Sequence, residues 1–386
     1  MNQLLSEIKS FPKKGDWVLL LLSLVVSAFG CVVIASATSA DKFGGTARYI
    51  IIQLVATGIG VFAYVLMSSI DVETLSEYRN GMVIFNTFLL LLLIPFGTDN
   101  GTGNKSWLDL PLMPMMVQPA EICKITYILI MASVMNSHQN RISHPVSVFH
   151  MAFHLILLVG LNMVLSEDAG VSLIFVFIFI GMAFAGGVNL LWFALVIGVI
   201  AVAFPILWPF LAEYQQERIM VLFDETLDPL GIGPRYNYKL SLLSLTGGFF
   251  SGQGLFNGYR TQNGMLFAQH TDFVFSTIGE ELGFLGCLFV ILLELAIVAR
   301  CVVVGLKTQD YMRRLICFGA ASALIFQNTI NIGMCLGVMP VIGLTLPLVS
   351  YGGSSIITIY AMLGLVSGAH ARPESLSHER YIQPYR

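Results

Sequence analysis

The sequence has little charge. Asp, Glu, Lys and Arg make up 11% of its 386 residues, whereas about 25% is usual in soluble domains. The charge is also unevenly placed, because residues 17–37, 169–212 and 315–371 contain none of these four residue types. About 20 consecutive apolar residues are enough for a helix to cross the hydrocarbon core of a membrane. An ordinary soluble protein is therefore excluded, and several membrane spans are predicted.

Two further absences narrow the choice of protein class. The formal net charge of −3 leaves no basic excess for nucleic acid, so we expect no nucleic-acid partner. The six cysteines lie within apolar segments, and their spacing is not that of a metal site. We interpret them as small buried hydrophobic side chains.

The apolar segments define the fold class. In lipid the backbone must satisfy its own hydrogen bonds, so long continuous spans are helices rather than barrel strands. We predict an all-α, polytopic membrane protein in which residues 1–386 form one membrane domain. Ten transmembrane helices are expected near residues 17–37, 49–70, 81–96, 119–136, 149–165, 169–187, 189–211, 273–299, 315–338 and 348–369.

An even number of spans places the tails 1–16 and 372–386 on one side of the membrane. If that side is the cytoplasm, the inner segments hold twelve lysines and arginines and the short outer loops hold three. This bias matches the positive-inside rule, so we expect a cytoplasmic-membrane protein with both termini in the cytoplasm. Residues 212–271 then form a large outer loop between the seventh and eighth helices. Loops of this length are usually functional or disordered, and its aromatic content favours an ordered loop and a function at the outer leaflet.

The stretch "HTDFVFSTIGEELGFLG" places three acids in one apolar segment. On a continuous helix its small residues form one narrow stripe headed by Asp272: Ser276, Gly279, Gly283 and Gly286. Such a stripe favours either a close helix–helix contact or a groove leading down from the acid. The two interpretations are compatible, but small residues alone do not explain the acid.

The two glutamates of this stretch differ from Asp272. Glu280 and Glu281 lie about 80° and 180° round the same helix and roughly 12 Å deeper. That distance is too long for a two-carboxylate site with Asp272. We expect structural polar contacts from both glutamates, with a second, deeper role as the alternative.

Other ionisable residues inside spans are candidates because burying charge in lipid is costly. "QPAEICK" places Glu121 and Lys124 at i and i+3, which suits either a buried ion pair or a functional site. Asp168 in "LSEDAG" lies at the outer end of a span. His150 and His154 are spaced i and i+4, but no third ligand is nearby, so we predict no metal site there.

The stretch "GLTLPLVSYGGSS" is rich in helix-breaking residues, with Pro347 inside it and Pro340 just before it. A broken helix at membrane depth is tolerated where the backbone packs in protein or lines a wet cavity. Four side chains would then be available to a polar ligand: Ser350, Tyr351, Ser354 and Ser355.

Four motifs together resemble those of the SEDS family, the shape, elongation, division and sporulation proteins. They are "QPAEICK", "YQQERI" followed by "DPLG", "HTDFVFSTIGEELG", and "GLTLP" followed by "SYGGSS". They occur in the family's order and spacing over essentially the whole chain. The resemblance implies a peptidoglycan glycosyltransferase that polymerises lipid II at the outer face of the cytoplasmic membrane. It also implies a class B penicillin-binding protein as the crosslinking partner, and contact with membrane lipids.

The resemblance implies roles for particular residues. The family's essential aspartate falls on Asp272, which we expect to be the catalytic base. The implied reaction is attack of a sugar 4-hydroxyl on the anomeric carbon that carries undecaprenyl pyrophosphate, with inversion. One carboxylate is enough as the base. The candidate substrate-binding residues are Lys105, Glu121, Lys124, Asp168, Arg218, Ser350, Tyr351 and Ser354.

The leaving pyrophosphate needs no proton but does need positive charge nearby. We expect Lys105, Lys124 and Arg218 to supply that charge. A divalent cation could share this role, but the sequence establishes no cofactor and assigns no metal ligands.

Two alternatives stay open at this point. Ten helices with intramembrane charges also suit a transporter or lipid flippase, although no inverted repeat is visible and the outer loop is large. The second alternative is a non-catalytic scaffold of the cell-wall synthase. Within the family, the short tails favour a RodA-like elongation role over an FtsW-like division role, while the motifs fit elongation, division and sporulation members alike.

Overall fold

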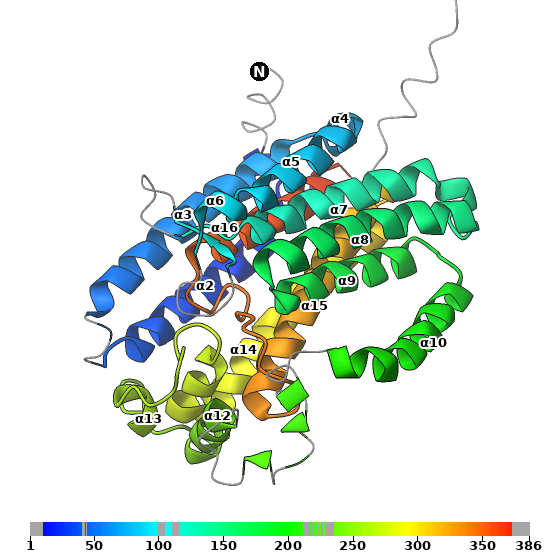
Figure 1. The fold of residues 1–386 in the computed structure, drawn as a ribbon. Coiled ribbons are helices and arrows are strands. Elements are labelled where there is room, and N and C mark those ends of the chain that lie inside the picture. The colour runs from blue at the N-terminus through cyan, green and yellow to red at the C-terminus, as the bar shows by residue number, and fades with distance from the viewer. Residues whose placement is uncertain are drawn as a thin grey trace, which may run out of the picture.

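The computed structural model describes residues 11–40, 43, 45–98, 105–109, 116–210, 216–217, 220–222, 224, 227–228 and 235–372. Within them the regular secondary structure is helical apart from one small antiparallel sheet of β1 (Gly97–Thr98) and β2 (Trp107–Leu108). Ten helical segments lie where spans were predicted (Figure 1). They are α2 (Trp17–Ala37), α3 (Thr46–Ser69), α5 (Arg79–Leu91) continued by α6 (Leu93–Phe96), α7 (Pro119–Ser137), α8 (Pro145–Ser166), α9 (Ala169–Ala185), α10 (Leu190–Leu207), α14 (Val274–Lys307), α15 (Tyr311–Leu336) and α16 (Gly353–Ala371).

Seven of these segments in the described chain are long and apolar enough to cross a membrane by themselves. The helices α9 and α10 are apolar but shorter, and α7 carries the charged residues Glu121 and Lys124. These two charges lower the mean hydropathy of α7 but do not change its length. With 19 residues, α7 is still long enough to cross the membrane. The prediction of an all-α, polytopic membrane protein is confirmed.

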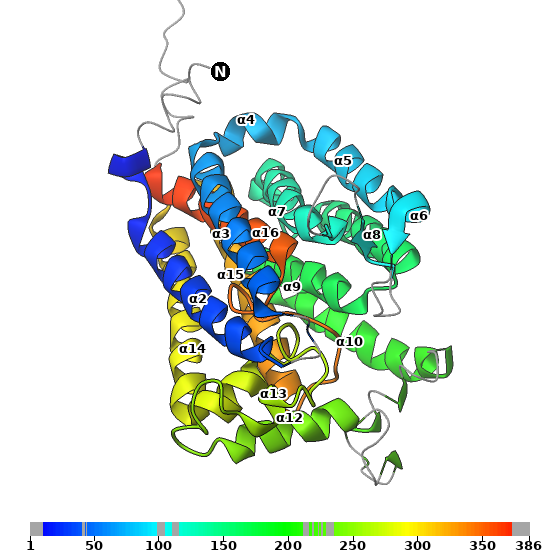
Figure 2. The same cartoon turned by 90° about the vertical axis from the view of Figure 1, so that its left-hand side faces the viewer.

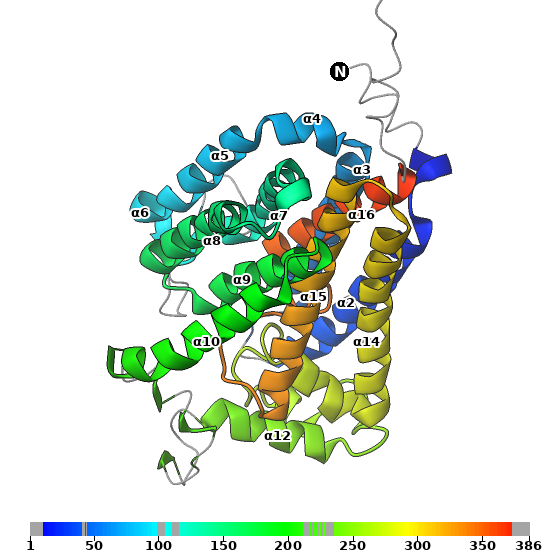
Figure 3. The same cartoon turned by 90° about the vertical axis from the view of Figure 1, so that its right-hand side faces the viewer.

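The helices α15 and α16 form the centre of the bundle. α16 packs along α3, and α15 packs against α7, α9 and α14 (Figures 2 and 3). Both central helices bury most of their side chains, polar ones included. By contrast α2, α5, α8 and α10 expose many large apolar side chains, as helices that face lipid do.

The described ends of the chain lie at the same end of the bundle, as an even number of spans requires. Lys14, just before α2, and Arg372, just after α16, line one shallow pocket. The described part of the predicted outer loop 212–271 lies at the opposite end of the bundle (Figure 1). Its described part contains α12 (Tyr236–Gly247) and α13 (Tyr259–Gln262), both packed on α14.

Glu280 and Glu281 fasten this loop to α14. Glu280 accepts hydrogen bonds from the backbone N–H groups of Arg260 and Thr261 at 3.0 and 2.8 Å. Glu281 accepts one from Gln262 Nε2 at 2.8 Å. Both glutamates are fully buried, so these bonds replace the water that a carboxylate would otherwise need. Their predicted structural role is confirmed.

The helix α14 is broken at Gly283. Its φ of 67° and ψ of −161° lie outside the helical region, in backbone space that is essentially open only to glycine. A break in a helix leaves the backbone N–H and C=O groups on either side without their intrahelical hydrogen bonds. The N–H groups of Phe284 and Leu285 instead donate to the carbonyls of Phe249 and Phe250, at 2.9 and 3.2 Å.

The same loop satisfies the other side of the break. The carbonyls of Glu280 and Glu281 accept hydrogen bonds from the N–H groups of Gln253 and Gly254, at 2.9 and 3.0 Å. Irregular backbone near lipid is stable only when its polar groups are paired within the protein. The turn that follows α12 therefore acts as a fixed partner for the broken helix.

The predicted stripe of small residues below Asp272 is not continuous, but its interpretation as a close helix–helix contact is confirmed, because α12 packs on this part of α14 and Ser241 Oγ lies 2.6 Å from Ser276 Oγ. Asp272 lies in a turn before α14, and the break at Gly283 ends the regular helical spacing. The small residues do not line an open groove either. A Cβ atom on Gly279 would lie 2.3 Å from Leu245 Cδ2 of α12, so the outer loop already fills that face.

Candidate active site

Asp272 is half-buried in the turn that leads into α14. Its backbone carbonyl accepts a hydrogen bond from Asn331 Nδ2 of α15 at 2.8 Å. Its carboxylate lies beside the backbone of Gly343, where an added Cβ would be 3.7 Å from Oδ2. Asn331 Nδ2 also donates to the carbonyl of Leu344 at 2.6 Å. One amide of α15 thus holds the Asp272 turn against the segment that precedes α16.

That segment, between α15 and α16, is not helical, as its prolines and glycines predicted. Ser350 Oγ accepts the N–H of Leu346 at 2.8 Å and donates to the carbonyl of Thr271 at 2.6 Å. The N–H of Tyr351 donates to the carbonyl of His270 at 2.9 Å. Ser350 and Tyr351 therefore hold the Asp272 turn in place, and the Ser350 hydroxyl is already used for this purpose.

Two other predicted residues of this segment are differently placed. The Tyr351 ring packs against Tyr49 and His270, with ring centroids 5.1 and 5.6 Å apart. Burial raises the pKa of the Tyr351 hydroxyl. Ser354, in the first turn of α16, has a buried hydroxyl without a hydrogen-bond partner among the described residues. Unlike the hydroxyl of Ser350, this buried hydroxyl is bonded to no described residue.

Asp168 lies near Asp272 and caps the N-terminus of α9. Its Oδ1 accepts the N–H of Val171 and its Oδ2 accepts Gln118 Nε2, both at 3.0 Å. Burial raises the pKa of the Asp168 carboxyl; the Val171 hydrogen bond lowers it, and the negative charge of Glu121 raises it again. Asp168 is thus oriented from two helices, with both of its oxygens bonded.

The surroundings of Asp272 raise the pKa of its carboxyl toward neutral pH. Burial raises the pKa of Asp272 to about 6; a hydrogen bond from Thr271 opposes the shift, and the negative charge of Asp168 adds to it. A carboxylate with a pKa near the working pH is well suited to accept a proton. Asp272, Asp168 and Glu121 therefore form a row of three acids in which the charge of Glu121 acts on Asp168 and that of Asp168 acts on Asp272.

The far end of this row is a buried ion pair. Lys124 Nζ lies 2.8 Å from the Glu121 carboxylate, and the two side chains are 4% and 5% exposed. Thr358 Oγ1 of α16 donates to Glu121 Oε2 at 2.9 Å. The ion pair predicted from the i, i+3 spacing is present, and it joins α7 to α16 beside the acids.

Lys105, another predicted cation, does not bond to the residues of this cluster. Lys105 is exposed before β2, and no described residue bonds to its ammonium group. Its neighbour Ser106 donates to the Ser166 carbonyl at 3.3 Å, which holds the strand near Asp168. Arg218 lies outside the described residues.

Sequence reasoning did not single out three residues that organise the site: Gln118, Asn331 and Thr358. Gln118 stood inside a recognised motif, but its bond to Asp168 joins segments 50 positions apart. Asn331 and Thr358 lie in the charge-free stretch, where a buried amide or hydroxyl is itself a signal because unpaired polar groups are costly in lipid.

The site offers no ready cation cage. No three His, Cys, Asp or Glu side chains in the described chain are arranged to share a metal ion. The oxygens of Asp168 and Glu121 are bonded to protein donors, so they do not fit a dedicated metal site. His150 lies at the opposite end of α8 from Asp168, and its Nδ1 contacts His138 Nε2 at 2.9 Å.

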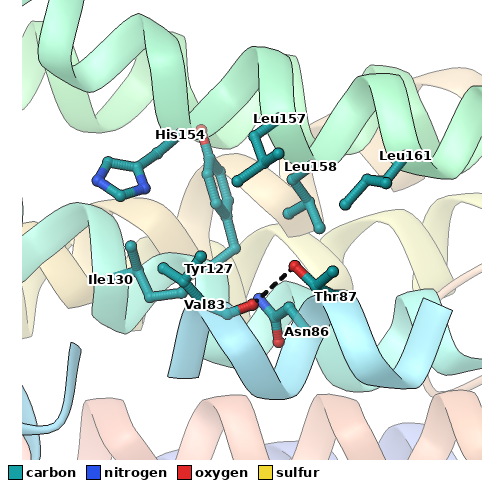
Figure 4. A pocket seen from close by; sticks show the side chains of 9 residues that line it. All are labelled: Val83, Asn86, Thr87, Tyr127, Ile130, His154, Leu157, Leu158 and Leu161. Carbon is teal, nitrogen blue, oxygen red and sulfur yellow. Dashed lines mark hydrogen bonds between the residues drawn. The ribbon is translucent and has the colours of Figure 1, made fainter. Parts of the chain in front are cut away.

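A separate small cavity lies between α5, α7 and α8 (Figure 4). Its walls are mostly aliphatic, and Tyr127 and His154 point into it. Tyr127 Oη and His154 Nε2 have no hydrogen-bond partner among the described residues. None of the acids described above lines this cavity, so it is distinct from the site at Asp272.

A family model described as "Cell cycle protein", covering FtsW, RodA and SpoVE, matches residues 16–374. The chain belongs to this family. Its motifs are those of the SEDS proteins named above, so the resemblance seen in the sequence is confirmed.

Two relatives of this SEDS chain carry an activity in their names. Peptidoglycan glycosyltransferase MrdB of Escherichia coli K12 is 31% identical over 365 residues, or 94% of this chain and 95% of MrdB. The probable peptidoglycan glycosyltransferase FtsW of Trichlorobacter lovleyi is 31% identical over 356 residues, or 91% of this chain and 92% of that protein. The chain is accordingly a multi-pass membrane glycosyltransferase.

Solved structures agree with the SEDS fold. RodA of Thermus thermophilus is 28% identical with a TM-score of 0.68, over 93% of this chain and 97% of RodA. A structure described as coordinating polymerization and crosslinking by a peptidoglycan synthase complex is 30% identical with a TM-score of 0.77, over 96% of this chain and all of that one.

Proposed function

We propose that this SEDS protein polymerises lipid II into glycan strands at the outer face of the cytoplasmic membrane, with both termini in the cytoplasm. The names of its relatives support the substrate class, and the distribution of lysine and arginine supports the orientation. The observation that carries the proposal is the setting of Asp272: a half-buried carboxyl with a pKa of about 6, held between α14, α15 and the segment before α16.

In the proposed reaction Asp272 is the general base. It accepts the proton of the acceptor sugar's 4-hydroxyl while that oxygen attacks the anomeric carbon of the donor. The new glycosidic bond forms as the bond from that carbon to pyrophosphate breaks, which inverts the anomeric centre. Asp168, fixed by Gln118 and Val171, raises the proton affinity of Asp272 through its negative charge.

The leaving pyrophosphate requires positive charge. We assign this role to Lys124, which Glu121 and Thr358 hold in position, and to Lys105 and Arg218. Ser354 supplies a free hydroxyl, and Tyr351 a ring, to the sugar or phosphate. A divalent cation bound with the substrate would add to this charge.

The proposed partner is a class B penicillin-binding protein that crosslinks the new strands. The solved synthase complex, whose description joins polymerization with crosslinking, supports this proposal. We propose a RodA-like role in elongation, which the similarity to solved RodA supports. MrdB and FtsW are equally similar in sequence, so identity does not decide between elongation and division.

Purified protein, supplied with lipid II and its penicillin-binding partner, is expected to produce glycan strands that a digest reduces to disaccharide units. The strands should appear in detergent, where no sealed membrane exists. A flippase would instead move lipid II across vesicles and form no strand, and a scaffold would do neither. The proposed function fails if the folded complex consumes no lipid II.

A further inference from the structure

A shallow pocket lies at the end of the bundle where the described ends of the chain meet, far from the acids of the active site. Figure 2 shows the start of α2 beside the end of α16, with the end of α3 nearby. The residues that line it are Phe11, Lys14, Gly15, Ser68, Ser69, Ala371 and Arg372.

The acids near this pocket are already paired. Asp16 binds Arg300 through two hydrogen bonds of 2.9 and 3.1 Å. Asp71 and Glu73 lie 3.8 and 3.5 Å from Arg313. Arg313 faces two carboxylates, so these pairs do not cancel all the negative charge at this end of the bundle. The described residues that line the pocket itself include no acid, and their charged side chains are both cations.

Lys14 and Arg372 are those cations. Arg372 donates to the carbonyls of Ile70 and Ser69 at 3.1 and 3.2 Å, which fixes its guanidinium at the end of α3. The helix ends here carry about half a negative charge each, and Arg372 offsets the one it bonds. Lys14 is exposed and bonds to no described residue. Unlike Arg372, it therefore caps no helix end, and its positive charge faces the pocket without a partner in the described chain.

Aromatic and apolar residues place the pocket at the level of lipid head groups. Trp17 is 46% exposed and its indole N–H donates to the Pro12 carbonyl at 3.1 Å, an arrangement typical of the membrane interface. The Phe11 ring packs on Trp17 under the pocket. Val18 and Leu21 of α2, 52% and 57% exposed, begin the lipid-facing surface immediately beyond.

We propose that this pocket binds the phosphate of an anionic phospholipid head group. Lys14 and Arg372 contact the phosphate, and the acyl chains lie along the exposed side of α2. Basic pockets at helix ends are suited to such head groups because both surface charge and hydrocarbon contact contribute. The lipid would join the N-terminal segment to α3 and α16. This site is independent of the proposed glycosyl transfer.

The test counts lipids bound to the purified full-length protein by native mass spectrometry. Phosphatidylglycerol is titrated against phosphatidylcholine with the same acyl chains. One phosphatidylglycerol is expected to bind more tightly than any phosphatidylcholine, and Lys14→Gln should weaken that binding about fivefold, the usual worth of one basic residue at an anionic surface. Lys14 is exposed, so the variant is expected to fold.

Lys13→Gln is the matched control, because Lys13 is also exposed, one position away, but does not line the pocket. It should bind phosphatidylglycerol like the unchanged protein. Equal losses in the two variants would mean general surface attraction and overturn the proposal. A pocket that binds inorganic phosphate but does not prefer phosphatidylglycerol to phosphatidylcholine would be a site for free phosphate, which would overturn the proposal. Binding that appears only after residues 373–386 are removed would assign the pocket to the chain's own tail.

Discussion

Asp272→Asn is expected to lose about 100-fold to 10,000-fold in the rate of lipid II polymerisation, the usual contribution of a general base. Asparagine keeps the size of the side chain but does not accept the proton of the attacking hydroxyl. The turn itself should survive, because its contacts run through the backbone: the Asp272 carbonyl to Asn331 and the Thr271 carbonyl to Ser350.

The measurement is strand formation by purified variant and unchanged protein, each with the same crosslinking partner. Glu167→Gln is the matched control, since Glu167 is an exposed acid two positions from α9 whose side chain bonds to no described residue. It should polymerise at the normal rate. An Asp272→Asn protein that elutes and melts like the parent yet polymerises normally would remove Asp272 from the mechanism.

Gly283→Ala is expected to lower the free energy of unfolding by about 2 to 6 kcal/mol, the sum of backbone strain and overpacking. The φ of 67° and ψ of −161° at Gly283 disfavour any side chain. A Cβ there would also lie 2.4 Å from the Gly252 nitrogen and 2.7 Å from the Phe250 carbonyl. Relief of that clash would separate the loop from α14 and leave four backbone groups near lipid without partners.

Thermal unfolding in detergent measures this change. Gly58→Ala, in the middle of α3, is the matched control because a Cβ at Gly58 meets no atom within 4 Å. There the substitution should be neutral or stabilising by up to about 1 kcal/mol, since alanine favours helix more than glycine does. If both variants melt alike, the break at Gly283 does not depend on glycine and the loop is not its fixed partner.

The positions of the spans could be read from the sequence because the membrane imposes a length and an apolar composition on each helix. The ends of the helices were less certain where polar residues determine them. α15 begins at Tyr311 rather than near 315, because Asp310 accepts the N–H of Arg313 at 2.8 Å and caps the helix earlier. α14 continues to Lys307 because its last turns are apolar enough to extend beyond 299.

The prediction of one continuous stripe of small residues was wrong for a different reason. Helical periodicity assumes an unbroken helix, and glycine is compatible with both a helix and a break. What selects the break at Gly283 is the set of hydrogen bonds from residues 249–254, and nothing local to α14 reveals a partner some 30 positions away. The acids were found because charge is rare in the chain, whereas the residues that orient them, such as Gln118 and Asn331, are neutral and became visible only through their contacts.

The pH dependence of single-turnover polymerisation tests the central claim most directly. Asp272 must be ionised to accept a proton, and burial places its pKa at about 6. The rate should therefore be constant above that pH and fall about tenfold for each further unit of acidification. This acid limb should be missing from the residual activity of Asp272→Asn. A rate that stays level from about pH 8 down to about pH 5, or an acid limb that persists unchanged without the carboxyl, would contradict a catalytic base at Asp272.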